Sequence, residues 1–305
     1  PHVGRGRFLS FGPVSPSFGR GPAVYQRNYC FGGVGFSLSA PVPIGESDAL
    51  RLFSGGETDA DYRVKLRLSD AFPQPPEGLY VHTRRVRGWR AGPRDCRLLY
   101  YYRSAGEPEV PYCYVERSGM EVAVDWLPAL SSGLHAQQIL ESVDLFRFLL
   151  EQGGVVLHAS YILHWGRALL FSAPSGTGKS TQAALWARLR GAEIVNGDRA
   201  LLRAREGCFQ AHGICFSGTS GICGNRSAPL SALVVLGQAE RSTCRRLGGK
   251  DAFRALLPQC AYRTWNPQDV AAATDTLSRL IGETPVLRLD CLPDESAVKA
   301  LEECL

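Results

Sequence analysis

A single run of ten residues, SAPSGTGKST at positions 172–181, carries the clearest chemical signal in this 305-residue chain. It matches the phosphate-binding pattern G-x-x-x-x-G-K-[ST], except that Ala173 stands in place of the first glycine. The two glycines let successive backbone N–H groups point at one anion, while Lys179 reaches the β- and γ-phosphates and Ser180 binds Mg²⁺. The residues expected to bind the nucleotide are Ser175, Gly176, Thr177, Gly178, Lys179, Ser180 and Thr181.

The flanking segments supply the strand, loop and helix order that this pattern requires. Residues 167–172, RALLFS, are a short apolar run typical of a buried strand, and residues 180–190 are rich in strong helix formers. Gly191 follows as the expected C-cap. The pattern that allows alanine at the first position, [AG]-x-x-x-x-G-K-[ST], occurs by chance in about one chain of this length in fifty. If the match is such a chance occurrence, the segment is a turn rich in glycine and serine between two core elements, which is the alternative interpretation.

We call the phosphate-binding loop at 173–181 the cradle, and the strand at 167–172 that leads into it the cradle strand. A second strand is expected immediately before the cradle strand. Residues 155–163, VVLHASYIL, are mostly apolar at the odd positions and place His158 and Ser160 on the other face. Only four residues, 164–167, connect the two strands, which leaves no room for a crossover helix and predicts an antiparallel hairpin. We therefore expect a mixed sheet in which His158 lies beside the cradle strand.

Two features after the cradle helix carry further chemistry. A strand at 192–195 ends at Asn196-Gly197-Asp198, and an acid in that position is typical of Mg²⁺ binding or of positioning a water or hydroxyl. A plain turn former is the alternative for Asp198. Residues 216–226, FSGTSGICGNR, form a loop rich in glycine and hydroxyl groups that ends at Arg226. Such loops bind anions or close over them, with a surface turn as the alternative.

The chain is expected to divide into three parts. Residues 1–26 hold five glycines and four prolines without hydrophobic period, which predicts a flexible tail. Residues 27–130 show short strands separated by turns, which predicts a small β-rich domain that binds the substrate or partner. Apolar residues recur at helical spacing over 136–151, which predicts one helix leading into a catalytic domain at 131–305. The expected fold class is α/β (α+β), with helices packed on a mixed β-sheet.

Composition limits the class of protein. The chain is 45% hydrophobic and 21% charged, and its net charge of +5 is too weak a bias to indicate nucleic-acid binding. No apolar run approaches the length of about 18 residues that crosses a bilayer, so no membrane association is expected. Ten cysteines without any C-x-x-C pair indicate a reduced, cytoplasmic protein. The composition does not decide whether the chain forms a homo-oligomer.

Taken in order, His158, the cradle at 173–181, Asp198 and the Ser-Gly-Thr-Ser-Gly loop at 217–221 resemble HPr kinase/phosphorylase and its smaller relatives. These are P-loop serine kinases with a fold like that of phosphoenolpyruvate carboxykinase. The resemblance covers about residues 150–240 and, more loosely, the rest to 305. It implies a P-loop domain with a mixed β-sheet of that type, preceded by the β-rich domain.

The resemblance also implies roles for single residues. His158 stands where the family has a histidine that supports the acid that activates the acceptor serine, and Asp198 matches the second of two adjacent aspartates. Gly197 stands in place of the first aspartate. The glutamate that the family carries after the next strand is not evident around His212-Gly213.

These residues predict a kinase that uses ATP and Mg²⁺ to phosphorylate a hydroxyl, with serine the expected acceptor, on a peptide or protein. A loose phosphoryl transition state needs positioning and charge neutralisation. The expected catalytic residues are Asp198, His158, Lys179 and a mobile arginine, Arg226, and the expected metal ligands are Ser180 and Asp198. A module that binds ATP without phosphotransfer, and an ATPase coupled to a partner, are the alternatives.

Overall fold

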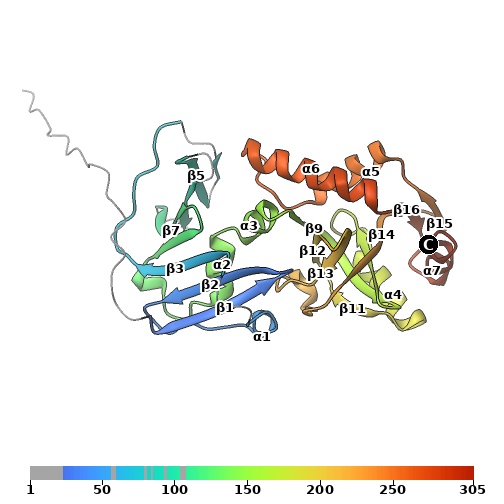
Figure 1. The fold of residues 1–305 in the computed structure, drawn as a ribbon, viewed down its shortest axis with the longest axis horizontal. Helices are drawn as coiled ribbons and strands as arrows, with labels where there is room; N and C mark the ends of the chain where they lie inside the picture. Colours follow the sequence, from blue (N-terminus) through green and yellow to red (C-terminus); the bar gives the residue numbers. More distant parts are fainter. Residues whose placement is uncertain (1–22, 56–59, 79–80, 84, 93–94, 104–107) are drawn as a thin grey trace, which may run out of the picture.

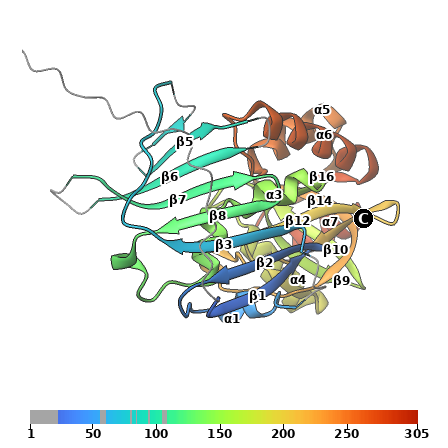
Figure 2. The ribbon, with the colours of Figure 1, turned by 60° about the vertical axis from the view of Figure 1, so that its left-hand side comes forward.

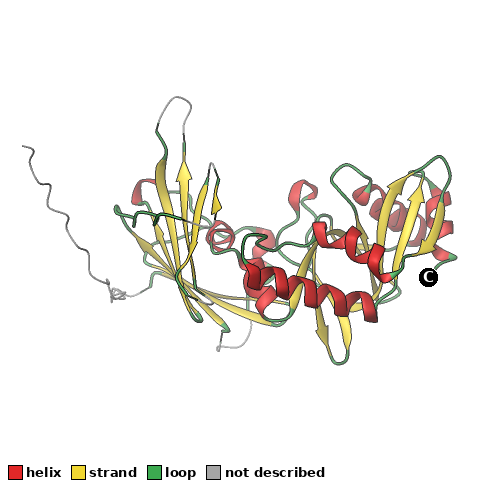
Figure 3. Ribbon diagram, turned by 90° about the horizontal axis from the view of Figure 1, so that it is seen from above, coloured by secondary structure: helices red, strands yellow, loops and turns green. Residues whose placement is uncertain are grey.

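The computed structural model describes residues 23–55, 60–78, 81–83, 85–92, 95–103 and 108–305. This part of the chain is mixed α/β, with two eight-stranded mixed sheets at the two ends of an elongated molecule and helices between and around them (Figure 1, Figure 3). The α/β class predicted from the sequence is confirmed at this level. No helix among the described residues is long and apolar enough to cross a membrane.

The first sheet has the strand order β1-β2-β3-β8-β7-β6-β5-β4, which Figure 2 shows face on. Neighbours are antiparallel except β2 with β3 and β3 with β8, which are parallel. A short helix, α1 (Asp48–Arg51), and a 3-10 turn, η1 (Pro128–Leu130), lie at its margins. The strands are β1 (Tyr25–Phe31), β2 (Val34–Ala40), β3 (Tyr62–Leu68), β4 (Val81–His82), β5 (Val86–Arg90), β6 (Cys96–Tyr102), β7 (Val110–Ser118) and β8 (Glu121–Trp126).

The predicted tail at 1–26 ends too late. Tyr25 and Gln26 belong to β1, where they pair with Ala40 and Ser39 of β2. Gln26, Arg27 and Asn28 are three consecutive polar residues in this edge strand, so no apolar alternation marks where the strand begins. Residues 1–22 of the predicted tail lie outside the described residues.

The single helix predicted over 136–151 is wrong, because two helices, α2 (Ala136–Ser142) and α3 (Leu145–Glu151), meet at a break. Asp144 at the break has φ +59°, a left-handed conformation that ends α2. The Asp144 carboxylate accepts a hydrogen bond from Arg263 Nε at 2.5 Å, and buried Arg147 pairs with Asp269 at 3.2 Å. Because a buried charge requires a partner, these pairs with residues 263 and 269 fix the direction of α3.

The helices α2 and α3 cover the first sheet and extend its apolar core. Ile139, Leu140 and Leu149 are fully buried in one cluster with the inward side chains of β1, β2 and β3. The same cluster reaches Val156 and Leu201 in the second sheet. The two halves therefore share a continuous apolar core, and the segment after residue 130 packs on the β-rich half.

The second sheet has the order β10-β9-β12-β13-β14-β16-β15, with β11 paired to β9. The cradle strand is β10, which also pairs in parallel with β14. A closed ring of strands therefore forms from β10, β9, β12, β13 and β14. The strands are β9 (Gly154–His164), β10 (Arg167–Ser172), β11 (Glu193–Asn196), β12 (Arg199–Arg205), β13 (Cys208–His212), β14 (Ser227–Gln238), β15 (Thr243–Arg246) and β16 (Val286–Cys291).

The predicted hairpin between β9 and β10 is confirmed. The strands are antiparallel, with Arg167 opposite His164 and Ser172 opposite Ala159. Trp165 and Gly166 in the turn both have positive φ, +49° and +72°, as the tightest hairpin turns require. The cradle strand thus has one antiparallel and one parallel neighbour, which makes the sheet mixed as expected.

Helices cover both faces of this sheet. The cradle helix α4 (Lys179–Arg190) packs with α7 (Glu295–Glu302) on one face, and α5 (Gly249–Leu256) packs with α6 (Pro267–Glu283) on the other. The cradle helix ends at Gly191 in the left-handed conformation, as predicted. Short 3-10 turns are η2 (Gly218–Ser220) and η3 (Leu257–Gln259).

Candidate functional site

The cradle joins the end of β10 to the first turn of α4. Gly176 and Gly178 have φ of +80° and +109°, and a Cβ built on either would meet no atom within 4 Å in the described chain. No side chain among the described residues caps the helix at Gly178. The first N–H groups of an α-helix have no partner within the helix, so this end is suited to an anion. The open loop and uncapped helix fit the phosphates of a nucleotide.

The Lys179 side chain is buried over the cradle. Its Nζ donates hydrogen bonds to the carbonyl oxygens of Ala173 at 2.9 Å and Pro174 at 3.3 Å. Burial lowers the pKa of Lys179 below its ordinary value, while the nearby Asp198 carboxylate acts in the opposite direction. The ammonium group therefore lies within electrostatic reach of both the loop and Asp198.

His158 and Asp198, 40 positions apart, are in contact. His158 Nε2 lies 3.2 Å from Asp198 Oδ1, and Arg199 Nε donates to Asp198 Oδ2 at 3.2 Å. The contact follows from strand register, because His158 in β9 lies opposite Arg199 at the start of β12. His158 and Asp198, which the sequence analysis singled out, thus form one cluster with Arg199. The catalytic roles of His158 and Asp198 stay predictions.

A buried amide holds this cluster in place. Asn196 Oδ1 accepts hydrogen bonds from the backbone N–H groups of Asp198 and Arg199, both at 2.9 Å. Its Nδ2 donates to the carbonyl oxygens of Ile214 at 2.9 Å and Phe216 at 3.2 Å. The sequence pattern singled out Asp198 in this segment but assigned no role to Asn196. It gave no sign that the Asn196 side chain also ties this turn to the segment before loop 217–221.

Loop 217–221 packs directly on Gly197 and Asp198. A Cβ built on Gly218 would lie 2.7 Å from Asp198 Cγ, so only glycine permits this approach. A Cβ built on Gly197 would lie 2.2 Å from Ser220 Oγ and 2.5 Å from Ser220 Cβ. Ser220 therefore occupies the space into which a side chain at position 197 would extend, which explains physically why glycine stands there.

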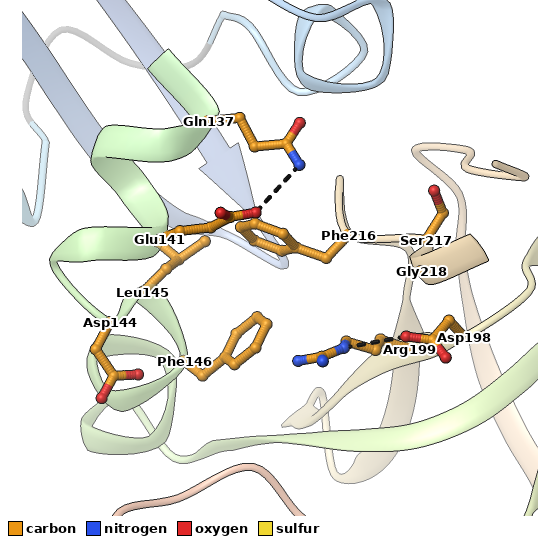
Figure 4. Close-up of a pocket in the computed structure, with 10 residues that line it drawn as sticks. All are labelled: Gln137, Glu141, Asp144, Leu145, Phe146, Asp198, Arg199, Phe216, Ser217 and Gly218. Carbon is orange, nitrogen blue, oxygen red and sulfur yellow. Dashed lines mark hydrogen bonds and ion pairs between the residues drawn. The ribbon is translucent and has the colours of Figure 1, made fainter. Parts of the chain in front are cut away.

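A pocket of about 380 Å³ opens beside Asp198 (Figure 4). We call it the Asp198 pocket. One wall comes from α2 and α3 and presents Glu141 and Phe146. The opposite wall comes from the start of β12 and from loop 217–221, with Arg199 and Ser217. Asp198 thus lines this pocket, and its charge also acts on the pKa of Lys179.

The Asp198 pocket combines aromatic and charged groups. The Arg199 guanidinium lies 5.0 Å from the centre of the Phe146 ring, and the Phe146 ring meets that of Phe216 edge to face at 5.1 Å. Glu141 accepts a long hydrogen bond of 3.4 Å from Gln137. The sequence singled out Asp198 and the loop that begins at Phe216, but no local pattern indicated that α2 and α3 would face them across a pocket.

Arg226 lies away from this cluster. Its guanidinium is 3.7 Å from the Glu193 carboxylate, and its side chain is 60% exposed. Arg226 does not line the Asp198 pocket, whereas Arg199 does. The expected role of Arg226 as a mobile arginine stays a prediction.

The predicted Mg²⁺ ligands are Ser180 and Asp198. The described residues contain no group of three or more His, Cys, Asp or Glu side chains that could hold a metal ion. In nucleotide sites, however, Mg²⁺ is bound by one or two protein oxygens together with phosphates. The Ser180 hydroxyl in the exposed first turn of α4 and the Asp198 carboxylate fit that requirement.

Comparisons with known proteins add little. No family model matches this chain, and no curated protein matches it. A solved structure, the Hpr(Ser) kinase/phosphatase from Coxiella burnetii, is similar over 30% of this chain and 70% of that chain, with 16% sequence identity. The TM-score of 0.23 is too low to carry an argument. The functional conclusion therefore depends on the site.

Proposed function

We propose that this chain is an ATP- and Mg²⁺-dependent kinase of the HPr kinase-like type, with serine of a peptide or protein as acceptor. The observation that carries the proposal is the position of Asp198. Its carboxylate contacts His158, faces the Asp198 pocket and lies within electrostatic reach of Lys179 at the cradle. One carboxylate between an anion cradle and a pocket is the arrangement that phosphoryl transfer to a hydroxyl needs.

Each residue of the cluster has a definite task in this proposal. The first-turn N–H groups of α4 and the Lys179 ammonium bind the phosphates. Ser180 and Asp198 would hold the Mg²⁺ ion, which would neutralise the charge that develops on the phosphates. His158 orients the Asp198 carboxylate, which accepts the proton of the acceptor hydroxyl. A pocket of about 380 Å³ has room for a side chain and its neighbours, in line with a peptide acceptor.

A nucleotide-binding module without phosphotransfer is the second candidate. It is favoured by the closed space at Gly197, where Ser220 leaves no room for a second carboxylate beside Asp198. A kinase needs one carboxylate to accept the proton of the acceptor hydroxyl, and Asp198 can do this alone. The kinase proposal is therefore compatible with the missing second carboxylate.

The test follows the γ-phosphate of labelled ATP in a reaction with Mg²⁺ and a mixture of serine-containing peptides. Label in peptide, dependent on Lys179, supports the kinase. Label released only as inorganic phosphate indicates an ATPase instead. Bound ATP that stays intact indicates the nucleotide-binding module, and a chain that binds no ATP removes the cradle from the argument.

A further inference from the structure

Loop 217–221 brings hydroxyl groups of the chain itself to the candidate acid. Gly218 lies against the Asp198 carboxylate, and Ser217 immediately before it lines the Asp198 pocket. Ser217 and Asp198 belong to the same side of this pocket (Figure 4). The chain thus places a serine of its own where the proposed function expects the serine of an acceptor.

The hydroxyls of this loop differ in their bonds. Ser220 Oγ donates to the Ser217 carbonyl oxygen at 2.6 Å and packs on Gly197. Thr219 is exposed and does not line the pocket. Among the described residues, no hydrogen bond engages the Ser217 hydroxyl, so it can turn without losing one. Ser217 is therefore the hydroxyl best placed to react.

Two glycines of the loop follow Ser217 and have left-handed backbone conformations. Gly218 and Gly221 have φ of +55° and +67°, and a Cβ on Gly221 would meet nothing within 4 Å. In Figure 4 the Ser217 hydroxyl is turned away from Asp198, so reaction requires a turn of this side chain or a shift of the loop. An acceptor already tethered at the site avoids the entropic penalty of bringing a second molecule to it.

We propose that Ser217 is an autophosphorylation site, an inference that rests on the proposed kinase function. In the step, Ser217 Oγ forms a bond to the γ-phosphorus of a nucleoside triphosphate while the bond from that phosphorus to the β,γ-bridging oxygen breaks. The nucleoside diphosphate leaves with the electron pair of that bond. The hydroxyl proton passes to the Asp198 carboxylate.

Phosphate on Ser217 would change the Asp198 pocket. Phosphoserine adds a charge of about −1.5 to −2 at neutral pH. Arg199 is the cation that lines this pocket, and a phosphate that pairs with it would weaken its bond to Asp198. The added group would also fill space that a peptide acceptor needs. Autophosphorylation is therefore expected to lower transfer to peptides.

The experiment uses the full chain, first as purified and then after incubation with Mg²⁺ and ATP labelled on the γ-phosphate, with and without serine peptides. Intact mass counts the phosphates, and tandem mass spectrometry of digests locates them. We expect one phosphate on Ser217 in the wild type and in the matched control Thr219→Ala, and none in Ser217→Ala or Lys179→Ala. The labelling rate should not depend on protein concentration.

The outcomes separate this inference from the proposed function. Label in peptides with none on Ser217 overturns the inference and leaves the kinase. Label on another residue, undiminished in Ser217→Ala, overturns the assignment to Ser217. Bound ATP with no label in either peptide or protein overturns both. Thermal unfolding of Ser217→Ala at the wild-type temperature excludes misfolding as the reason for lost label.

Discussion

The cradle and the Asp198 pocket meet at one carboxylate but are built in different ways. The cradle consists of consecutive residues, 173–181, between a strand and a helix. The pocket draws its walls from three separate segments, at 137–146, 198–199 and 216–218. A site of consecutive residues depends on local backbone conformation, whereas a site of distant segments depends on packing. Changes in the cradle should therefore alter ligand affinity, and changes around the pocket should also alter stability.

Asp198→Asn gives the largest expected effect, because this residue is common to both regions. The change keeps size but removes the charge that accepts a proton. Help from a general base is worth about 10²–10⁴-fold in rate, so transfer to peptide should fall by that order while ATP affinity changes far less. Single-turnover transfer and calorimetry with Mg²⁺ and ATP measure the two quantities. Equal loss of both would assign Asp198 to the metal alone, and unchanged transfer would make it a turn residue.

Acid should weaken the segment that leads into the pocket wall. His212 ends β13, and burial lowers its pKa to about 4 from 6.5, with a smaller contribution from the cations Arg205 and Arg203. The unfolded chain therefore binds a proton that the folded chain does not. His212 stabilises the fold fully above pH 6.5, and up to about 3 kcal/mol is lost as the pH falls to about 4.

Urea unfolding between pH 7 and pH 4.5 measures this effect. The variant His212→Gln keeps a group that can bond Ser227, the partner of His212 Nδ1 at 2.7 Å, but does not titrate. Its free energy of unfolding should fall less steeply with acid than that of the wild type. Parallel pH profiles of the two proteins would contradict the assignment.

Lys179→Ala tests the cradle alone. A hydrogen bond to a charged group contributes about 1.5–3 kcal/mol, so ATP affinity should fall by that amount. The free energy of unfolding should change much less, because the hydrogen bonds of the Lys179 ammonium within the described part of the chain go to carbonyls of its own loop. Lys299→Ala, at an exposed lysine of α7, is the matched control and should bind ATP as the wild type does. Unchanged affinity in Lys179→Ala would remove the cradle from the site.

Gly197→Ala tests packing beside the pocket. The new Cβ meets the Ser220 side chain, and overpacking of this kind destabilises proteins by about 1–3 kcal/mol. Adding Ser220→Gly should restore most of the lost stability. Gly282→Ala, in α6 with nothing within 4 Å of the new Cβ, should instead stabilise by up to about 1 kcal/mol. Urea unfolding of the wild type, the two single variants Gly197→Ala and Ser220→Gly, and the double variant measures this cycle, with Gly282→Ala as a fifth protein and control. An unchanged free energy of unfolding in Gly197→Ala would show that loop 217–221 moves away from the new Cβ at no cost.

Most elements near the cradle could be predicted, and most of the pocket could not. The hairpin of β9 and β10 followed from a connection too short for a helix, and the C-cap at Gly191 followed from its place after a run of helix formers. The break at Asp144 could not be foreseen, because the apolar period continues across it. What decides the break is the pairing of Asp144 with Arg263 and of Arg147 with Asp269.

Ten consecutive residues were enough to predict an anion cradle, because phosphate binding uses neighbouring backbone N–H groups, two adjacent side chains and a helix end, all fixed by local conformation. Strand alternation likewise placed His158 on the polar face of β9. Only the folded chain brought His158 to Asp198, put Ser217 and Asp198 on the wall of one pocket and closed the space at Gly197 with Ser220. These contacts depend on strand register and on packing between segments far apart in the sequence, which no local pattern encodes.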